Sequence, residues 1–327
     1  MTPPIALTLG DPAGVGAEIA LKAFAALGGA VPFFLIGDPA HLAAPAAAFG
    51  VPLRVIAAPG EAAGGGGLPV LAHPLPQAPV PGRPDPANAA ATIAIIARGV
   101  ELVRAGAALA LCTGPINKKA LIDGAGFPFP GHTEFLAHLS GAALPVMMLA
   151  APGLRVVPVT IHIPLAEVPR RLTADLLEAT LRITHQALVT DFGIAAPRIA
   201  VAGLNPHAGE GGAMGREEIE VIGPVVARLA AEGLAVDGPR SADTMFHEAA
   251  RAGYDAAVCM YHDQALIPIK TIDFDRGVNV TLGLDFVRTS PDHGTAYDIA
   301  GQGRASPASL IAALELARAM GAARRRA

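Results

Sequence analysis

Three histidines each follow a short apolar run, and imidazole side chains in such positions could bind a metal ion. They are His162 after the run Arg155–Thr160, His207 after Ile199–Ala202 and His262 after Ala256–Cys259. Each run is strand-like, and the carboxyl ends of neighbouring strands in a parallel sheet share one edge, so the histidines are expected to converge there. Three neutral imidazoles with an open coordination position suit a catalytic zinc or a similar divalent ion. Three unrelated histidines in turns remain the alternative, because spacing over this range is not a strong ligand signature.

His207 lies in the segment Gly203–Glu218, GLNPHAGEGGAMGREE, which is polar and rich in glycine within an otherwise apolar chain. The segment runs from the end of a predicted buried strand to the first turn of a predicted helix. Such strand-to-helix turns are where α/β proteins place their chemistry.

A second group of polar residues crowds the C-terminal third of the chain. It contains Lys270, Asp273, Asp275, Arg276, Asn279, Arg288, Thr289, Ser290, Asp292 and His293. Lysine, arginine and asparagine near a metal site suit an anionic substrate, above all a phosphate or a carboxylate. A solvated loop with local ion pairs is the alternative.

Two further turns could bind phosphate. At Gly131–Glu134, backbone N–H groups, the Thr133 hydroxyl and His132 could hold a phosphate, or Thr133 could merely cap the helix. The turn Gly10–Gly16 could cradle a phosphate or only reverse the chain. It matches no GxGxxG or P-loop pattern, so the residues alone do not require NAD. No GxSxG elbow supports serine hydrolysis.

The elements that must position these residues are short apolar runs alternating with longer amphipathic stretches. Predicted strands include Ile5–Leu9, Phe33–Ile36, Leu109–Cys112, Val146–Leu149 and Gly277–Leu282, and predicted helices include Ala87–Ala105, Thr173–Phe192 and Ser306–Ala322. A further helix is predicted over Asp243–Ala252 with Asp243 as its N-cap, and the excursion Ala57–Pro86 is predicted to hold one edge strand at Leu68–Leu71. The alternation indicates a largely parallel sheet covered by helices on both faces.

Composition narrows the class of protein. The 327 residues are 52% hydrophobic and 16% charged, which suits two domains or one large α/β unit with an ample core. A net charge of −4, 4% aromatic residues and no tryptophan argue against a nucleic-acid partner. Cys112 and Cys259 end apolar runs and suit a reducing compartment. No signal peptide is expected, and prolines interrupt Ala142–Ile163 too often for a membrane span, so we expect a soluble cytoplasmic protein.

Taken together, the motifs resemble those of the 4-hydroxythreonine-4-phosphate dehydrogenase family of pyridoxal phosphate biosynthesis. They are GDPAGVG, TGPINK, GHTEFL, IHIPL, GLNPHAGEGGAMGREE, YHDQALIPIK and GVNVTLGLDFVRTSPDHGTA, in an order and spacing typical of that family from about Ile5 to Ala300. The resemblance implies a two-domain α/β/α fold like that of the isocitrate and isopropylmalate dehydrogenases, with the active site in the interdomain cleft. The expected domains are residues 1–130 with 300–327, and residues 131–299, which carry the metal ligands and dimer contacts.

The resemblance also implies the roles of particular residues. One divalent ion per subunit (zinc, magnesium or cobalt) is expected on His162, His207 and His262. The substrate is expected to be bound by His132, Thr133, Lys270, Asn279 and Arg288. Because a substrate-facing arginine needs no partner in the fold, we expect Arg288 to have none. Asp243 and Asp263 support the site, and Lys270, Asp263 and Asp243 are the candidate catalytic residues. The family forms a homodimer whose metal sites take ligands from both subunits.

The implied reaction is NAD- or NADP-dependent oxidation of 4-phosphooxy-L-threonine to 2-amino-3-oxo-4-phosphooxybutanoate, which decarboxylates to 3-amino-2-oxopropyl phosphate. A sister dehydrogenase acting on 4-phospho-D-threonate or 4-phospho-D-erythronate is one alternative, because such a change needs few residue differences. A metal-dependent phosphate hydrolase is a more remote one.

Overall fold

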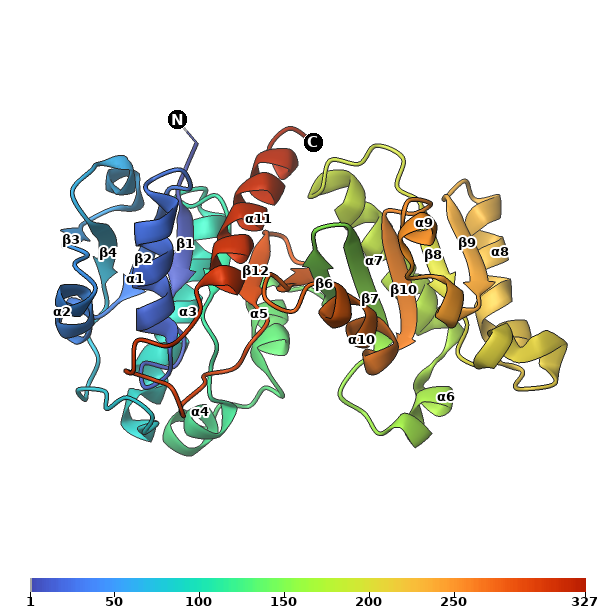
Figure 1. Ribbon diagram of the computed structural model, residues 1–327, viewed down its shortest axis with the longest axis horizontal. Coiled ribbons are helices and arrows are strands. Elements are labelled where there is room, and N and C mark those ends of the chain that lie inside the picture. Colours follow the sequence, from blue (N-terminus) through green and yellow to red (C-terminus); the bar gives the residue numbers. More distant parts are fainter. Residues whose placement is uncertain (1) are drawn as a thin grey trace. The chain divides into compact units, whose positions relative to one another are not determined.

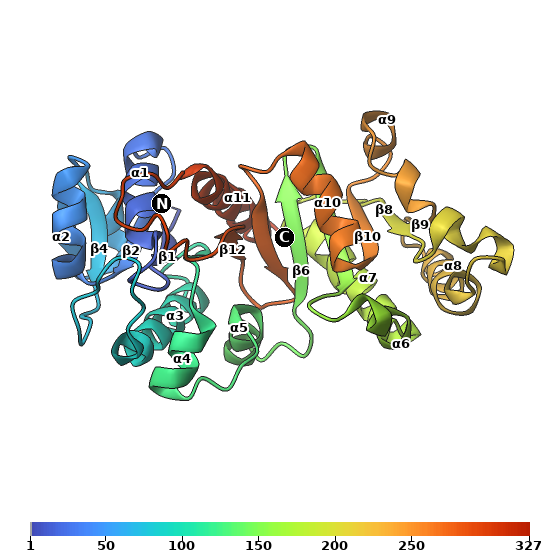
Figure 2. The ribbon, with the colours of Figure 1, turned by 60° about the horizontal axis from the view of Figure 1, so that its bottom comes forward.

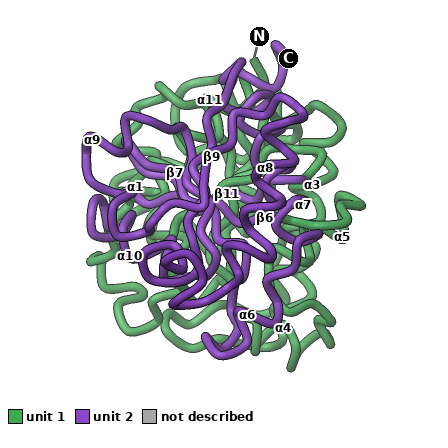
Figure 3. Tube along the Cα trace, turned by 90° about the vertical axis from the view of Figure 1, so that its right-hand side faces the viewer, with its two compact units in different colours: residues 1–145, 284–322 green, residues 146–283, 323–327 purple. Residues whose placement is uncertain are grey.

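The computed structural model describes residues 2–327 (Figure 1). The chain divides into two compact units, coloured separately in Figure 3: residues 1–145 with 284–322, and residues 146–283 with 323–327. The division expected at 131 and 299 would place helix α5 (His132–Ser140) and strand β12 (Arg288–Pro291) in the second unit. Both belong to the first, because Phe135 and Leu136 of α5 share the core of that unit and β12 pairs with one of its strands.

The sheet of the first unit is parallel throughout, as the sequence predicted for a sheet covered on both faces. Its strands are β1 (Ile5–Thr8), β2 (Phe33–Gly37), β3 (Leu53–Ile56), β4 (Leu68–Ala72), β5 (Leu111–Thr113) and β12, in the order β3-β4-β2-β1-β5-β12. The predicted strand at Leu68–Leu71 is present as β4, but it is not an edge strand, because β3 pairs along its outer side.

The helices of the first unit are α1 (Gly16–Leu27), α2 (Pro39–Ala48), α3 (Ala89–Arg104), α4 (Lys118–Ala125), α5 and α11 (Ala308–Arg324), with short 3-10 turns at Pro59–Ala63 and Pro86–Asn88. In Figure 2, α1 and α11 lie on one face of the sheet and α3 lies on the other. The segment Pro86–Arg104 is long and apolar enough to cross a membrane by length and composition alone, but 50% of it is buried inside the protein, as in a core helix.

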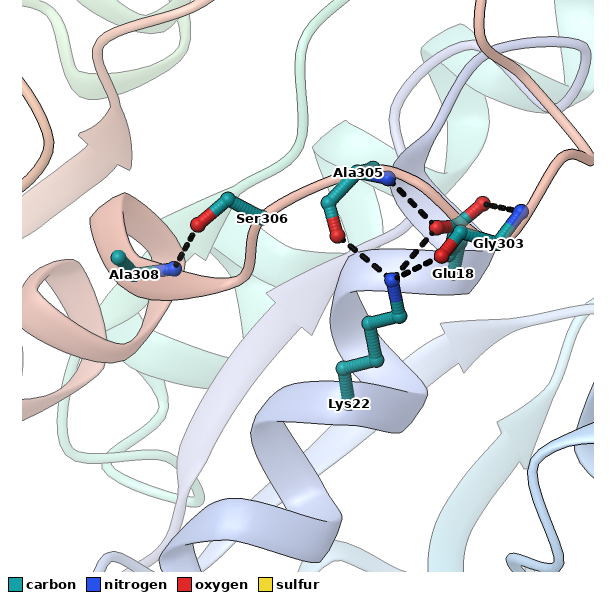
Figure 4. Close-up of polar contacts among 6 residues, drawn as sticks. All are labelled: Glu18, Lys22, Gly303, Ala305, Ser306 and Ala308. Carbon is teal, nitrogen blue, oxygen red and sulfur yellow. Dashed lines mark hydrogen bonds and ion pairs between the residues drawn. The ribbon is translucent and has the colours of Figure 1, made fainter.

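A carboxylate in α1 fixes the chain that leads into α11 (Figure 4). Glu18 accepts hydrogen bonds from the backbone N–H of Ala305 at 2.7 Å and of Gly303 at 3.1 Å, and from Lys22 Nζ at 2.8 Å. The Ser306 hydroxyl then accepts the N–H two residues further on, as expected for a residue that starts a helix. These contacts hold the C-terminal helix against its own unit.

The sheet of the second unit is mixed. Its strands are β6 (Val146–Ala151), β7 (Leu154–Thr160), β8 (Ile199–Ala202), β9 (Val236–Arg240), β10 (Ala256–Tyr261) and β11 (Val278–Leu282), in the order β11-β6-β7-β10-β8-β9. β6 runs antiparallel to β11 and β7, whereas β7, β10, β8 and β9 are parallel to one another. The three strands that precede the histidines are therefore adjacent and parallel.

The helices of the second unit are α6 (Val168–Arg171), α7 (Ala174–Thr190), α8 (Gly223–Ala231), α9 (Glu248–Arg251) and α10 (His262–Ile272). Short turns occupy Leu165–Glu167, Pro206–Gly212 and Ala242–Thr244, and a π-helical turn spans Glu218–Ile222. Figure 2 shows α10 on one face of this sheet and α7 on the other. The predicted helix over Asp243–Ala252 is wrong: α9 begins only at Glu248 with His247 as its N-cap, and Asp243 lies in the preceding 3-10 turn.

Candidate active site

Two of the three predicted histidines form a close pair within one chain. The ring centroids of His162 and His262 are 5.6 Å apart. His162 follows β7 and His262 is the first residue of α10 after β10, so the parallel pairing of β7 with β10 brings them to the same edge. The pair lines a cavity of about 250 Å³ together with Leu165, Val168 and Asp263. The sequence-based expectation that these two histidines converge is confirmed.

His207 follows β8 at the same edge, but it does not join the pair. Among residues 2–327, no group of three or more His, Cys, Asp or Glu side chains lies close enough together to hold a metal ion. The convergence of all three histidines within one chain, expected from strand order alone, is therefore wrong. His207 lies in the turn Pro206–Gly212, within the loop after β8.

The donor atoms of the pair nevertheless suit a divalent ion. His262 Nδ1 lies 2.7 Å from Asp263 Oδ1, which leaves Nε2 as the nitrogen available for a metal. A carboxylate on the second ring nitrogen is the usual partner of a metal-binding histidine, since it fixes the tautomer and the ring orientation. In this structure the Asp263 carboxylate is therefore already paired with the His262 ring.

The backbone at two of the histidines is strained. The non-glycine residues with positive φ in the described chain are His162, His207, Ala208, Glu210 and Ala296. The left-handed region costs roughly 1–2 kcal/mol for such residues and recurs at functional sites. The rest of the fold must therefore hold the backbone of His162, at φ 52°, and of His207, at φ 50°, in this unfavourable conformation.

In the first unit, His132 has the features of a ligand-binding residue. It opens α5, and its Nε2 atom is buried without a hydrogen-bond partner in the part of the chain that the structure describes. Burial, and after it the positive charge of Arg288, lowers the pKa of His132 well below its ordinary value, so the ring is neutral. Gly131 is the N-cap residue, and no side chain caps the helix, so Thr133 is not the capping residue that the sequence left open.

Arg288 differs from the expectation of a partnerless, substrate-facing side chain. It is 4% exposed, and it donates from Nη2 and Nε to Thr113 Oγ1 at 2.7 and 3.2 Å. Burial lowers the pKa of Arg288 to about 10, so the guanidinium keeps its charge at neutral pH. The structure thus places a buried, held cation beside the neutral ring of His132. Thr113 lies in the TGPINK motif, but no sequence signal identified it as the partner of Arg288.

The remaining predicted residues lie in the second unit. Lys270 is two turns after His262 on α10, and both line a cavity of about 430 Å³ with Leu266 and Ile267. Asn279 lies in β11, where it pairs with a residue of β6. Asp243 accepts a hydrogen bond from the Ser241 hydroxyl at 2.6 Å. A helix therefore places the Lys270 ammonium on the same face as the candidate metal ligand His262.

The glycines of the turn Gly10–Gly16 pack closely against neighbouring backbone. A Cβ on Gly16 would lie 2.1 Å from the Leu9 carbonyl oxygen, and one on Gly14 would lie 2.8 Å from the Thr295 carbonyl oxygen. These glycines let the backbone pack tightly, so of the two alternatives the structure favours the tight turn.

Comparisons with known proteins point to one family. The family model described as pyridoxal phosphate biosynthetic protein PdxA matches residues 30–317. A protein of Paracoccus denitrificans (strain Pd 1222) named 4-hydroxythreonine-4-phosphate dehydrogenase is 59% identical over 325 residues, covering 98% of each chain. The crystal structure of a 4-hydroxythreonine-4-phosphate dehydrogenase from Klebsiella pneumoniae is 41% identical, with a TM-score of 0.90 over 98% of each chain. A terephthalate 1,2-cis-dihydrodiol dehydrogenase from Burkholderia xenovorans LB400 is 33% identical, with a TM-score of 0.67 over 97% of this chain and 98% of that one.

The fold and these relatives define the class of the protein: it is an α/β oxidoreductase, and its dehydrogenase identity implies a nicotinamide cofactor. More narrowly, the chain belongs to the PdxA family of pyridoxal phosphate biosynthesis, as its motifs predicted.

Proposed function

We propose that this enzyme oxidises the C3 hydroxyl of 4-phosphooxy-L-threonine with NAD+ or NADP+. The hydride passes from C3 to the nicotinamide, and the hydroxyl proton is released. The product, 2-amino-3-oxo-4-phosphooxybutanoate, is a β-keto acid that loses CO2 to give 3-amino-2-oxopropyl phosphate. The observation that carries the proposal is the full-length match, at 59% identity, to a relative of that name. A cytoplasmic location is part of the same proposal.

The anionic groups of the substrate are assigned to His132, Thr133, Lys270, Asn279 and Arg288. A buried guanidinium beside a neutral imidazole with a free nitrogen favours a phosphate or carboxylate, because the cation attracts it and the imidazole can donate a hydrogen bond. The Arg288 fork is already oriented by Thr113, which reduces the entropy lost on binding.

The divalent ion is assigned to His162 and His262 of one subunit and to His207 of a second copy. Support comes from the close His162–His262 pair and from the left-handed backbone at His162 and His207. Exposed apolar side chains beside the pair favour coverage by a second copy: Leu165 is 67% exposed and Ile267 is 63% exposed. A bound zinc, magnesium or cobalt ion would lower the pKa of the substrate hydroxyl and stabilise negative charge on that oxygen.

Side chains of this protein are assigned to orient a metal ligand and to accept the substrate proton. Asp263 holds the His262 ring through Nδ1, which is an orienting role. Lys270 lies on the same helix face as His262 and is the residue we assign to accept the hydroxyl proton. Asp243, fixed by Ser241, is assigned a supporting role in the same unit.

The test is to add 4-phosphooxy-L-threonine with NAD+ or NADP+ to the purified dimer and to follow the absorbance of the reduced nicotinamide. Values of kcat/KM for 4-phospho-D-threonate and 4-phospho-D-erythronate, measured in parallel, separate the sister activities. A higher kcat/KM on either rival substrate would replace the proposed substrate. Release of inorganic phosphate without cofactor reduction would mean a hydrolase and would overturn the proposal.

A further inference from the structure

His207 lies within a run of five left-handed residues. The φ angles are 50° at His207, 51° at Ala208, 80° at Gly209, 45° at Glu210 and 64° at Gly211. Three of the five are not glycine, and L-residues do not sustain a left-handed turn by themselves. Some other part of the fold must therefore hold this loop in shape.

The groups that hold it are the carboxylate of Glu218 and the side chain of Asn205. Glu218 Oε1 accepts the Asn205 backbone N–H at 2.8 Å, and Oε2 accepts Asn205 Nδ2 at 2.9 Å. Glu217 Oε2 accepts from the same Nδ2 at 2.7 Å. Glu218 is buried, at 5% exposed, and begins the π-helical turn, a feature frequent at functional sites. Asn205 directly precedes Pro206 and His207, so the contacts fix the start of the left-handed run.

The loop is closely packed around these two side chains. A Cβ on Gly209 would lie 2.6 Å from Glu218 Oε2, and one on Gly215 would lie 2.1 Å from Asn205 Nδ2. A side chain at either glycine would therefore collide with the Glu218 carboxylate or the Asn205 amide. The Glu218–Asn205 contact lies inside the loop and determines its path.

A second side chain ties this loop to the element that carries His262. Gln264 Oε1 accepts the Met260 N–H at 2.7 Å, and its Nε2 donates to the Gly203 carbonyl at 2.8 Å. Met260 is near the end of β10, and Gly203 begins the His207 loop directly after β8. One amide therefore fixes both chain segments from which the candidate ligands emerge.

We propose that Glu218, acting through Asn205, is a positioning residue that preforms the His207 loop for metal binding. The inference rests on the proposed function, in which His207 is a metal ligand. Because the loop is held by contacts within its own unit, it is ordered before the ion arrives. Removing the carboxylate should free the loop and weaken metal retention by about 10- to 100-fold, the range seen when groups that orient ligands are changed.

The variant to test is Glu218→Gln in the full-length dimer. It keeps the shape of the side chain but turns one oxygen into an NH2 group that faces an N–H of Asn205. Two measurements apply: zinc affinity by chelator competition, and amide hydrogen exchange of residues 203–216 in the metal-free protein. We expect zinc binding at least about tenfold weaker and faster exchange in the loop. The kcat at saturating metal should stay within about threefold of wild type, because no reacting group has changed.

Glu220→Gln is the matched control. Glu220 lies in the same π-helical turn, is exposed and pairs with Arg216. This variant should leave zinc affinity and loop exchange unchanged. Should Glu218→Gln prove unstable, Asn205→Ala, which removes only the side-chain donor, decides the matter by the same two measurements.

Zinc affinity and loop exchange equal to those of the control would overturn the inference. So would a kcat that excess metal fails to restore in a folded variant, since Glu218 would then act on more than the position of His207. His207→Ala tests the underlying function separately. If that variant retains zinc as wild type does, the assignment of His207 as a ligand fails, whatever Glu218→Gln does to the loop.

Discussion

Replacing Arg288 by Lys should impair both catalysis and folding, and the structure gives the size of each effect. The guanidinium donates two hydrogen bonds to Thr113 Oγ1, whereas a lysine ammonium is a point donor that cannot copy the planar fork. Hydrogen bonds from charged groups contribute about 1.5–3 kcal/mol each, so losing one should lower the free energy of unfolding by that amount. Loss of the planar guanidinium that is proposed to bind the substrate anion should separately reduce kcat/KM by about 2–3 kcal/mol, or roughly 30- to 150-fold.

The assay measures kcat/KM with 4-phosphooxy-L-threonine and the free energy of unfolding by urea titration for each protein. Arg104→Lys is the matched control, because Arg104 pairs with Asp285 at 2.9 Å while both side chains are about half exposed. Exposed pairs contribute about 0–1 kcal/mol, so the control should change neither quantity appreciably. Near-normal kcat/KM with lowered stability would show that Arg288 is only structural. Unchanged stability would contradict the role given to its contact with Thr113.

Three further predictions concern assembly and pH. When subunits with His162→Ala and subunits with His207→Ala are exchanged, about a quarter of wild-type activity should return, because half the dimers are mixed and each mixed dimer has one intact site. A mixture of His162→Ala and His262→Ala subunits should stay inactive. The reverse pattern would mean that His162 and His262 of one site come from different subunits. Phe274→Asp should shift the proposed dimer toward monomer in sedimentation experiments, because Phe274 is 75% exposed and the variant would no longer offer an apolar contact there. An unchanged dimer would exclude Phe274 from the interface. His132 has a folded-state pKa below its ordinary 6.5, so its contribution to stability is present above about pH 6.5 and is lost as the pH falls. The variant His132→Asn should therefore show a flatter decline of the thermal midpoint below that pH. An equally steep decline in the variant would assign the effect to other groups.

The sheet edge that carries the histidines could be predicted from the sequence. Short apolar runs alternating with amphipathic stretches predict parallel strands, and residues after such strands meet at one edge. That argument placed His162 and His262 together correctly. It failed for His207 because strand order fixes only where a loop begins. The path of that loop depends on Glu218, thirteen residues beyond Asn205 in the chain, and no local pattern announces such a contact.

The surroundings of Arg288 also could not be predicted from the sequence. The polar segment from Lys270 to His293 predicted anion binding, but alternation of residue types does not reveal which strands are neighbours. In the structure β12 pairs with β5, which places Arg288 opposite Leu111 and within reach of Thr113. A partner 175 positions away is visible only once the sheet order is known. The same pairing places Arg288 in the first unit rather than in the second.

The energies of the His207 loop explain why a buried carboxylate is needed there. His207, Ala208 and Glu210 are left-handed at a cost of roughly 1–2 kcal/mol each, or about 3–6 kcal/mol in total. The two hydrogen bonds that Asn205 donates to Glu218 contribute about 1.5–3 kcal/mol each, which is the same range. Losing one of them, about 1.5–3 kcal/mol, would leave the ligand correctly placed for only about one-tenth to one-hundredth of the time, so that metal would bind about 10- to 100-fold more weakly. Contacts within the second unit would thus determine how tightly His207, the proposed ligand, holds a metal.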